Sequence, residues 1–158
     1  MKKQFFDLML YIMKDNPDVF LIFCGLGYPR FEEFSTLYPD RALNFEASEQ
    51  TALDAAVGLA YSGKIPFVYT ITPFLYRGFE TIRTYINHEK LHVIMIGAGR
   101  DTDYSKHDGH SHDAQDISEI LGTQKNIVQH YPDDLNDLKD SIDLAINIKK
   151  PHFISIRR

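Results

Sequence analysis

The sequence predicts an α/β fold, with a single doubly wound and mainly parallel sheet that carries helices on both faces. Three observations support this prediction. Short, continuously apolar segments, typical of parallel strands buried on both sides, recur along the chain. Segments with apolar residues at helical spacing alternate with them. No repeat, low-complexity tract or linker interrupts this alternation, so we expect one domain over residues 1–158.

The first half of the chain is expected to contain three helices and two strands. Apolar residues recur at helical spacing up to Asn16-Pro17, a pair that ends helices, which predicts a helix over residues 2–14. Residues 19–23 are apolar throughout and end at Gly25, as expected of a buried strand. The next elements are a helix near 28–37, a strand near 41–45, and a helix that Ser48 caps and that ends at Tyr61, before Gly63.

The second half should contain four strands and three helices. The strands are expected at 67–71, at 92–96 before Gly97-Ala98-Gly99, at 127–130 and at 152–157. The helices are expected at 75–87, 113–121 and 133–149, with a loop from Arg100 to His112. In parallel sheets the functional residues follow the carboxyl ends of strands. The loops to search are therefore 45–50, 71–77 and 97–112.

Composition excludes several classes of protein. Hydrophobic residues at 44% and charged residues at 25% are typical of a soluble globular chain. The net charge of -5 argues against binding nucleic acid by phosphate neutralisation. No apolar stretch approaches the ~20 residues that span a bilayer, and Asp7 interrupts the apolar start of the chain. The single Cys24 fits a reducing compartment. We expect a cytoplasmic protein that binds neither nucleic acid nor membrane.

Two of the loops contain residues that have both a structural and a functional interpretation. Glu49 is either a first-turn acid favoured by the helix dipole, or a carboxylate buried in a cofactor pocket that shares a proton with a ring nitrogen. Pro73 at a strand-to-helix junction is ordinary helix-start chemistry. Phe74 is either a core residue or a platform on which a ring stacks.

Residues 107–113 contain three histidines and two aspartates, a density that suggests a metal site. However, they lack the His-x-His-x-Asp-His order of metallo-β-lactamases, and no other His/Cys cluster completes a site. The alternatives are solvent-exposed loop histidines and a polar substrate pocket. A metal-dependent hydrolase that uses His107, His110 and His112 is therefore one of the rival functions, although we expect no metal bound by this chain.

Four motifs follow one another along the chain. They are Ser48-Glu49-Gln50 followed by Val57-Gly58-Leu59-Ala60; Thr72-Pro73-Phe74-Leu75-Tyr76-Arg77 continuing to Ile82-Arg83; Asp108-Gly109-His110-Ser111-His112 with Asp116 and Ile117 downstream; and Phe153-Ile154-Ser155-Ile156-Arg157. In this order they resemble the pyrimidine-binding domain of transketolases and deoxyxylulose-phosphate synthases. The resemblance covers the chain from about Leu21 to Arg157.

The resemblance implies a role for each matching residue. Glu49 matches the glutamate that hydrogen-bonds the pyrimidine ring of thiamine diphosphate and starts its activation, and Phe74 matches the aromatic residue that stacks on that ring. Gln50 and Ile71 complete the implied cofactor-binding set. Asp108 and His112 match residues that contact sugar hydroxyls and the reacting carbonyl. Together with Glu49, they are the implied catalytic residues. Arg157 matches an arginine that binds the substrate phosphate, and Arg77 is a second candidate for that region.

The implied function is transfer of a two-carbon ketol unit between sugar phosphates or related sugars. The Gly-Asp-Gly…Asn motif that holds Mg²⁺ and diphosphate in the family does not occur in the sequence. The resemblance therefore implies a partner, a diphosphate-binding subunit that supplies Mg²⁺, in a dimer or an α2β2 tetramer. The chain stops where a transketolase would begin its linker to the last domain. We expect the small-residue helix 48–60 to lie at a subunit interface.

The sequence departs from the family at two positions that border the implied cofactor site. Glu46-Ala47-Ser48 stands where the family has Gly-Ile-Ala, and Ile71 replaces an aromatic residue. A catalytically inactive paralogue that acts as a scaffold or regulator is the second rival function. The sequence does not identify the sugars, and it does not separate ketol transfer from a synthase or decarboxylase reaction.

Overall fold

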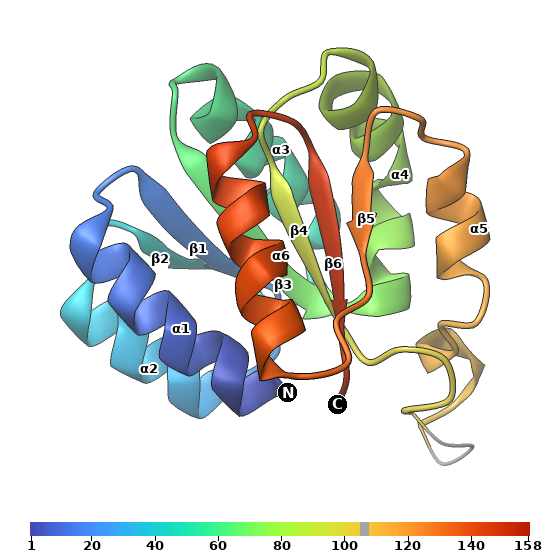
Figure 1. Cartoon of the computed structure of the whole chain (residues 1–158), viewed down its shortest axis with the longest axis horizontal. Coiled ribbons are helices and arrows are strands. Elements are labelled where there is room, and N and C mark those ends of the chain that lie inside the picture. Colours follow the sequence, from blue (N-terminus) through green and yellow to red (C-terminus); the bar gives the residue numbers. More distant parts are fainter. Residues whose placement is uncertain (105–107) are drawn as a thin grey trace.

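The computed structural model describes residues 1–104 and 108–158 and has the α/β architecture that the sequence predicts. Its strands are β1 (Val19–Phe23), β2 (Ala42–Asn44), β3 (Ile65–Ile71), β4 (Ile94–Ala98), β5 (Val128–His130) and β6 (His152–Ile156). They form one six-stranded sheet in the order β2-β1-β3-β4-β6-β5, and every pairing between these strands is parallel (Figure 1).

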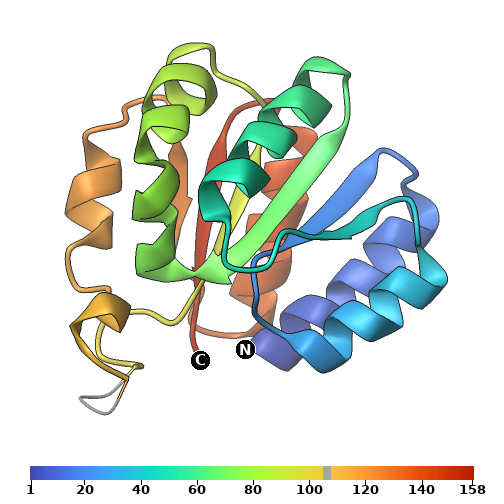
Figure 2. The same ribbon diagram turned by 180° about the vertical axis from the view of Figure 1, so that it is seen from behind.

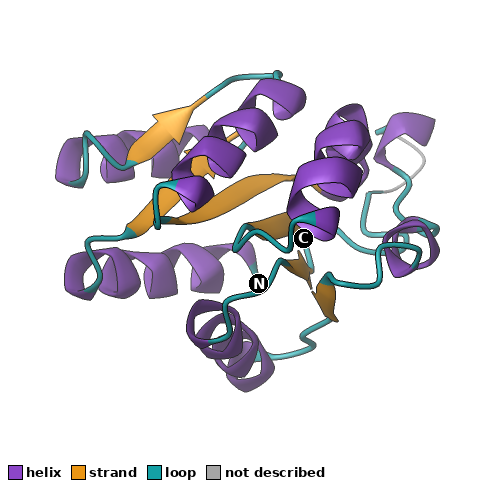
Figure 3. Ribbon diagram, turned by 90° about the horizontal axis from the view of Figure 1, so that it is seen from above, coloured by secondary structure: helices purple, strands orange, loops and turns teal. Residues whose placement is uncertain are grey.

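Helices cover both faces of the sheet (Figures 1 and 2). One face carries α1 (Lys2–Asp15), α2 (Tyr28–Leu37) and α6 (Leu135–Asn147). The other carries α3 (Glu49–Tyr61), a helical segment over residues 72–88, and α5 (Ile117–Gly122). Successive strand residues enter different cores: on β1, Phe23 belongs to the first core and its neighbour Ile22 to the second. Viewed from above, the sheet lies between two helical layers (Figure 3).

The helical segment after β3 begins earlier than the predicted residue 75. It consists of η1 (Thr72–Gly78), a tight 3₁₀ stretch, then α4 (Phe79–Thr81) and η2 (Ile82–His88), a π-helical stretch. The Thr72 hydroxyl donates a hydrogen bond to the Gly99 carbonyl, and Pro73 is buried beside it. These contacts start the helix directly at the end of β3, so no separate loop precedes it.

The strand predicted at 92–96 instead covers residues 94–98, and Gly97 lies inside it. A Cβ atom on Gly97 would lie 2.5 Å from the Thr72 hydroxyl oxygen and 2.8 Å from the Phe153 ring. Gly97 is therefore required because the start of η1 and the ring on β6 approach the strand closely. It does not mark the end of the strand, as the sequence had suggested.

The helix predicted at 113–121 is shorter and covers residues 117–122. Asp113 accepts a hydrogen bond from the backbone N–H of Gln115, which forms a local turn. Ala114 pairs with Asp101 in an antiparallel bridge. Both contacts compete with helix formation, so only a short 3₁₀ turn, η3 (His110–His112), precedes α5.

The strand order places a topological switch point between β1 and β3. From β1 the chain continues to β2 on one side, and from β3 it continues to β4 on the other. Ligands bind outside the carboxyl ends of strands at such a point. Both chain termini lie at this same edge of the molecule (Figure 1). Within the described part of the chain, no helix has the length and apolar character needed to cross a membrane.

Candidate cofactor and substrate site

Glu49 lies in the first turn of its helix, as the structural interpretation expects, and its carboxylate is also buried. It is the first residue of α3, at the carboxyl edge of the sheet, and only 1% of it is exposed. Ser48 is the N-cap residue, but its side chain makes no capping hydrogen bond. The helix therefore begins after Ser48, as predicted, but without a capping hydrogen bond from the serine hydroxyl.

The buried carboxylate of Glu49 has two hydrogen-bond donors. The Thr70 hydroxyl on β3 donates to one oxygen at 3.3 Å, and the Arg77 guanidinium donates to the other at 2.8 Å. Cys24, at the end of β1, lies close enough for its thiol to be affected. Burial, together with the charge of Glu49, raises the pKa of Cys24 to about 12, which keeps the thiol protonated near neutral pH. The segments that follow β1, β2 and β3 therefore meet at the switch point, through Cys24, Glu49 and Arg77 respectively.

Phe74 and Arg77 lie side by side on η1. Residues three apart in a 3₁₀ helix lie on the same side, because the helix has three residues per turn. The Arg77 guanidinium carbon lies 3.9 Å from the centroid of the Phe74 ring, directly over its face. Phe74 is half-buried and belongs to neither apolar core cluster, which favours the platform interpretation over the core interpretation.

The two remaining predicted cofactor residues border this group. Ile71 is the last residue of β3 and is half-buried. The side chain of Gln50 is exposed. Its backbone forms part of the packing between α3 and η1, because a Cβ atom on Gly78 would lie 3.2 Å from the Gln50 Cα. Ile71 thus borders the site through its side chain, whereas Gln50 supports it through the backbone.

Glu46 occupies the position where the resemblance expects glycine. Its φ of 52° lies in the left-handed region, which costs a side-chain-bearing residue about 1–2 kcal/mol. Its carboxylate accepts hydrogen bonds from the Tyr28 hydroxyl at 3.2 Å and from the Asn44 amide at 2.9 Å. These contacts offset the strain, so the backbone keeps a glycine-like conformation before Glu49 without a glycine.

The His-rich loop extends the site from Phe74 toward the end of the chain. The ring centroid of His112 lies 5.0 Å from that of Phe74 and 5.3 Å from that of Tyr104. Its Nδ1 atom lies 3.2 Å from the Ser111 hydroxyl. Asp108 is half-buried and accepts a hydrogen bond from Arg158 at 3.1 Å. His112 therefore connects Phe74 on η1 to Tyr104 of the loop.

Arg157 lies in the same region but contacts neither Asp108 nor His112 among the described interactions. Its guanidinium donates to Asp103 at 3.2 Å and lies 3.3 Å from an oxygen of Asp101. The guanidinium groups of the two arginines that end the chain thus bind different carboxylates of one loop, while the backbone N–H of Arg158 also donates to Asp103 at 3.0 Å. A phosphate group at Arg157 would have to compete with two aspartates.

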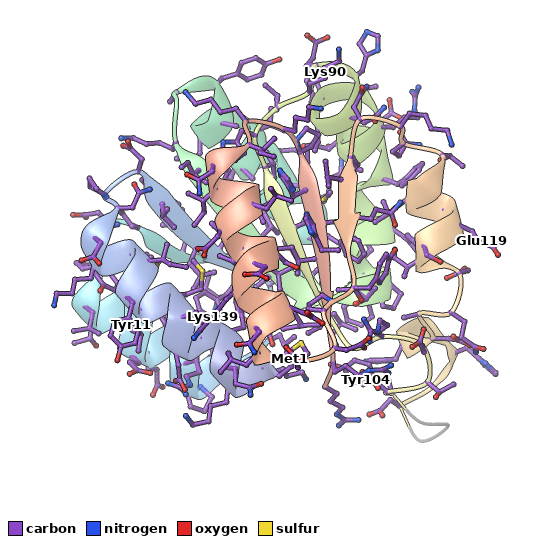
Figure 4. All side chains as sticks on the ribbon, in the orientation of Figure 1. Met1, Tyr11, Lys90, Tyr104, Glu119 and Lys139 are labelled. Carbon is purple, nitrogen blue, oxygen red and sulfur yellow. The ribbon has the colours of Figure 1, made fainter. Side chains whose placement is uncertain are left out.

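Sequence reasoning did not single out Arg158 or Tyr104. The Arg158 guanidinium carbon lies 4.7 Å from the centroid of the Tyr104 ring, and Lys2 donates to the Tyr104 hydroxyl at 3.0 Å. Figure 4 shows Tyr104 and Met1 at the edge of the molecule opposite Lys90. The signal available in the sequence was weak: Tyr104 is the only aromatic residue of the 97–112 loop apart from its histidines.

Two cavities open beside the loop and have several residues in common. A cavity of about 650 Å³ is lined by Asp101, Thr102, Tyr104, Gly109, His110, Asp113 and Gln115. A second cavity of about 350 Å³ is lined by Pro73, Tyr76, His110, Ser111, Asp113, Gln115 and Asp116. Hydroxyl, amide and carboxylate side chains contribute to both linings, although most of the exposed lining of the larger cavity is apolar, as suits a ligand with both polar and apolar parts.

The metal alternative depended on His107, which lies outside the described residues, together with His110 and His112. Within residues 1–104 and 108–158, no group of three or more His, Cys, Asp or Glu side chains is placed to hold a metal ion. His112 instead packs between Phe74 and Tyr104, and His110 borders both cavities.

Comparison with protein families matches residues 1–158 to the family described as "Transketolase, pyrimidine binding domain". A 1-deoxy-D-xylulose-5-phosphate synthase of Dehalococcoides mccartyi strain CBDB1 is 33% identical over 147 residues, covering 89% of this chain and 22% of that protein. A subunit of the apulose-4-phosphate transketolase of Actinobacillus succinogenes is 29% identical, covering 75% and 38% respectively. A putative transketolase C-terminal section of Methanocaldococcus jannaschii is 26% identical, covering 100% and 50%. The chain thus spans between about a fifth and a half of these relatives.

Solved structures show the same fold. A structure described as "Split gene transketolase, inactive beta4 tetramer" superposes with a TM-score of 0.86 at 24% identity, covering 99% of this chain and 51% of that one. Transketolase from Campylobacter jejuni superposes with a TM-score of 0.87 at 15% identity, covering 98% and 25%. With the family match over the whole chain, these findings establish that the chain belongs to the transketolase pyrimidine-binding domain family.

Proposed function

We propose that residues 1–158 act as the pyrimidine-binding domain of a thiamine-diphosphate-dependent enzyme that transfers a two-carbon ketol unit between sugar phosphates or related sugars. The observation that carries the proposal is the carboxylate of Glu49, which is 1% exposed at the switch point of the sheet. The guanidinium of Arg77 contacts both this carboxylate and the face of the Phe74 ring. A buried acid next to an aromatic ring face fits a planar heterocycle with ring nitrogens.

Each residue of the cofactor side has a distinct task in this proposal. Glu49 holds a proton between its carboxylate and the pyrimidine nitrogen, and burial strengthens that hydrogen bond. Phe74 offers its face to the ring, and Ile71 borders it. Thr70 fixes the orientation of the carboxylate from β3. When bound, thiamine diphosphate supplies the electron sink for breaking a carbon–carbon bond next to a ketose carbonyl.

The substrate side is assigned to the loop and the end of the chain. His112 donates a hydrogen bond to the reacting oxygen, and its ring is held between Phe74 and Tyr104. Asp108 binds sugar hydroxyls. Arg157 binds an anionic group of the substrate, a task suited to a planar cation with several donors. Because Arg157 is paired with Asp101 and Asp103, the substrate anion would replace these carboxylates as its partner.

The proposal includes a partner subunit that supplies the diphosphate site and Mg²⁺, in a dimer or an α2β2 tetramer. Relatives named as a transketolase subunit and as a C-terminal section support a multi-subunit assembly. The outer face of α3 supports its placement at the interface. Gly58 is exposed there, and nothing lies within 4 Å of a Cβ atom built on it, which leaves room for another helix to approach. We assign the assembly to the cytoplasm, where the single Cys24 stays reduced.

Calorimetry of cofactor binding tests this proposal. The chain alone should bind thiamine diphosphate weakly, because the pyrimidine ring offers few anchoring contacts without a diphosphate site. Addition of a diphosphate-binding transketolase subunit and Mg²⁺ should produce tight binding, together with ketol transfer from a sugar donor. Binding that stays absent in the complex would contradict the proposal. Assembly with no turnover would favour the rival role as an inactive scaffold or regulator.

A further inference from the structure

Arg77 holds both groups that the proposed function assigns to the cofactor ring. Its guanidinium donates a hydrogen bond to Glu49 at 2.8 Å, and its central carbon lies 3.9 Å from the centroid of the Phe74 ring. No other described side chain makes an ion pair with Glu49. A single arginine therefore covers the carboxylate and the aromatic face together.

A guanidinium group resembles a protonated aminopyrimidine in its recognition chemistry. Both are planar, both delocalise charge, and both carry N–H donors in the plane while their faces stack on aromatic rings. One carboxylate oxygen and one ring face cannot serve two planar donors at the same time. Thr70 already donates to the other Glu49 oxygen, so a pyrimidine ring that pairs with the oxygen bound by Arg77 and stacks on the face that Arg77 covers must displace the guanidinium.

We propose that Arg77 is a positioning residue that occupies the pyrimidine position in the ligand-free chain and leaves it when the cofactor enters. This inference rests on the proposed function. Arg77 keeps the Glu49 carboxylate and the Phe74 ring in the arrangement that the incoming ring requires. Once displaced, its guanidinium becomes available to an anionic group of the substrate. Cofactor loading therefore precedes the binding of that anion at Arg77.

The burial of the two partners explains why such a residue is needed and why it can leave. Glu49 is 1% exposed, whereas the Arg77 side chain is 48% exposed. Without Arg77 the buried carboxylate would keep only the Thr70 hydroxyl and no cation, which is destabilising, so a cationic group at this position stabilises the ligand-free chain. Nearly half of the Arg77 side chain is exposed to water, which lowers the cost of moving it away from Glu49.

The test is cofactor affinity in the assembled complex with Mg²⁺, measured by calorimetry for Arg77→Met, Arg77→Lys and Arg83→Met. Removal of the competing guanidinium in Arg77→Met should tighten thiamine diphosphate binding about 3- to 30-fold. Arg77→Lys keeps the charge but cannot stack as a plane, so its affinity should lie between those of Arg77→Met and the unmodified chain. Arg83→Met is the matched control. Arg83 follows on the same helical segment and pairs with the exposed Glu80, so its substitution should leave the affinity unchanged.

A second measurement uses the unmodified chain and does not depend on how the variants fold. The ¹⁵N-edited NMR signals of the Arg77 guanidinium should show restricted rotation without ligand and free rotation once thiamine diphosphate is bound. This inference would be overturned if Arg77→Met bound thiamine diphosphate no more tightly than the unmodified chain, or if the Arg77 NMR signals did not change on cofactor binding. Either result would leave the proposed function standing. Failure of every variant, the control included, to bind thiamine diphosphate would contradict the proposed function itself.

Discussion

The cofactor side and the substrate side of the candidate site are held in different ways. Glu49 and Phe74 lie on α3 and η1, both packed directly against the sheet, and Glu49 is almost completely buried. Asp108 and His112 lie on a loop whose neighbours Gly109, His110 and Ser111 are exposed. Groups on rigid elements keep their geometry more accurately than groups on loops. Under the proposed function, the rigid elements would hold the cofactor ring in a fixed geometry, and the loop could vary to suit different sugars.

The largest effect on the substrate side is expected for His112→Ala. Loss of one hydrogen-bond donor to a reacting oxygen lowers kcat by about 10²–10³. Steady-state kinetics of the reconstituted complex provide the measurement, with thiamine diphosphate affinity as a second readout that should not change. His88→Ala, an exposed histidine on η2, is the matched control. Equal activity of the two variants would remove His112 from the proposed chemistry.

Acid should weaken the fold through a third region that belongs to neither side of the site. His152 is fully buried, and its pKa is lowered to about 4, chiefly by burial and further by the charges of His130, His92 and Lys150. The hydrogen bond between its ring and the Ile148 carbonyl opposes this shift. Burial also lowers the pKa of His130. Protonation of these histidines is therefore favoured in the unfolded chain.

The sign of the pH effect follows from the lowered pKa. Above the ordinary pKa of about 6.5, His152 is neutral in both states and costs no stability. Between pH 6.5 and 4, His152 binds a proton in the unfolded chain but not in the folded chain. The free energy of unfolding should then fall by about 1.4 kcal/mol per pH unit. Urea unfolding at several pH values measures this slope, which should become shallower in His152→Gln. An unchanged slope would assign the acid sensitivity to groups other than His152.

The smallest effect is expected for Arg157→Ala. Arg157 is 44% exposed and paired with Asp101 and Asp103. The net binding free energy of a substrate anion at Arg157 is therefore only the difference between the new ion pair and the pairs that it replaces. The KM for a phosphorylated sugar should rise about 3- to 10-fold, while kcat and cofactor affinity stay constant. A change in cofactor affinity would show that the two sides of the site are coupled more closely than this comparison implies.

The sequence predicted the cofactor side better than the substrate side, and the reason is physical. Glu49 and Phe74 follow strands and start helices, so local patterning already placed them at the carboxyl edge of the sheet. The partners of Arg157 and Arg158 depend on how the loop folds back on the end of the chain, which no local pattern encodes. The same holds for Gly97, whose small size is explained by rings and hydroxyls from distant segments.

The central claim is that Glu49 is the acid that activates the cofactor. The most direct measurement is the rate of C2-proton exchange of thiamine diphosphate, followed by NMR in the reconstituted complex with Mg²⁺. Glu49→Gln keeps the shape of the side chain but cannot hold the proton, so the exchange rate should fall about 10²–10⁴-fold while assembly persists. Glu46→Gln removes an exposed carboxylate of the same loop and should exchange like the unmodified chain. An unchanged exchange rate in Glu49→Gln would contradict the account.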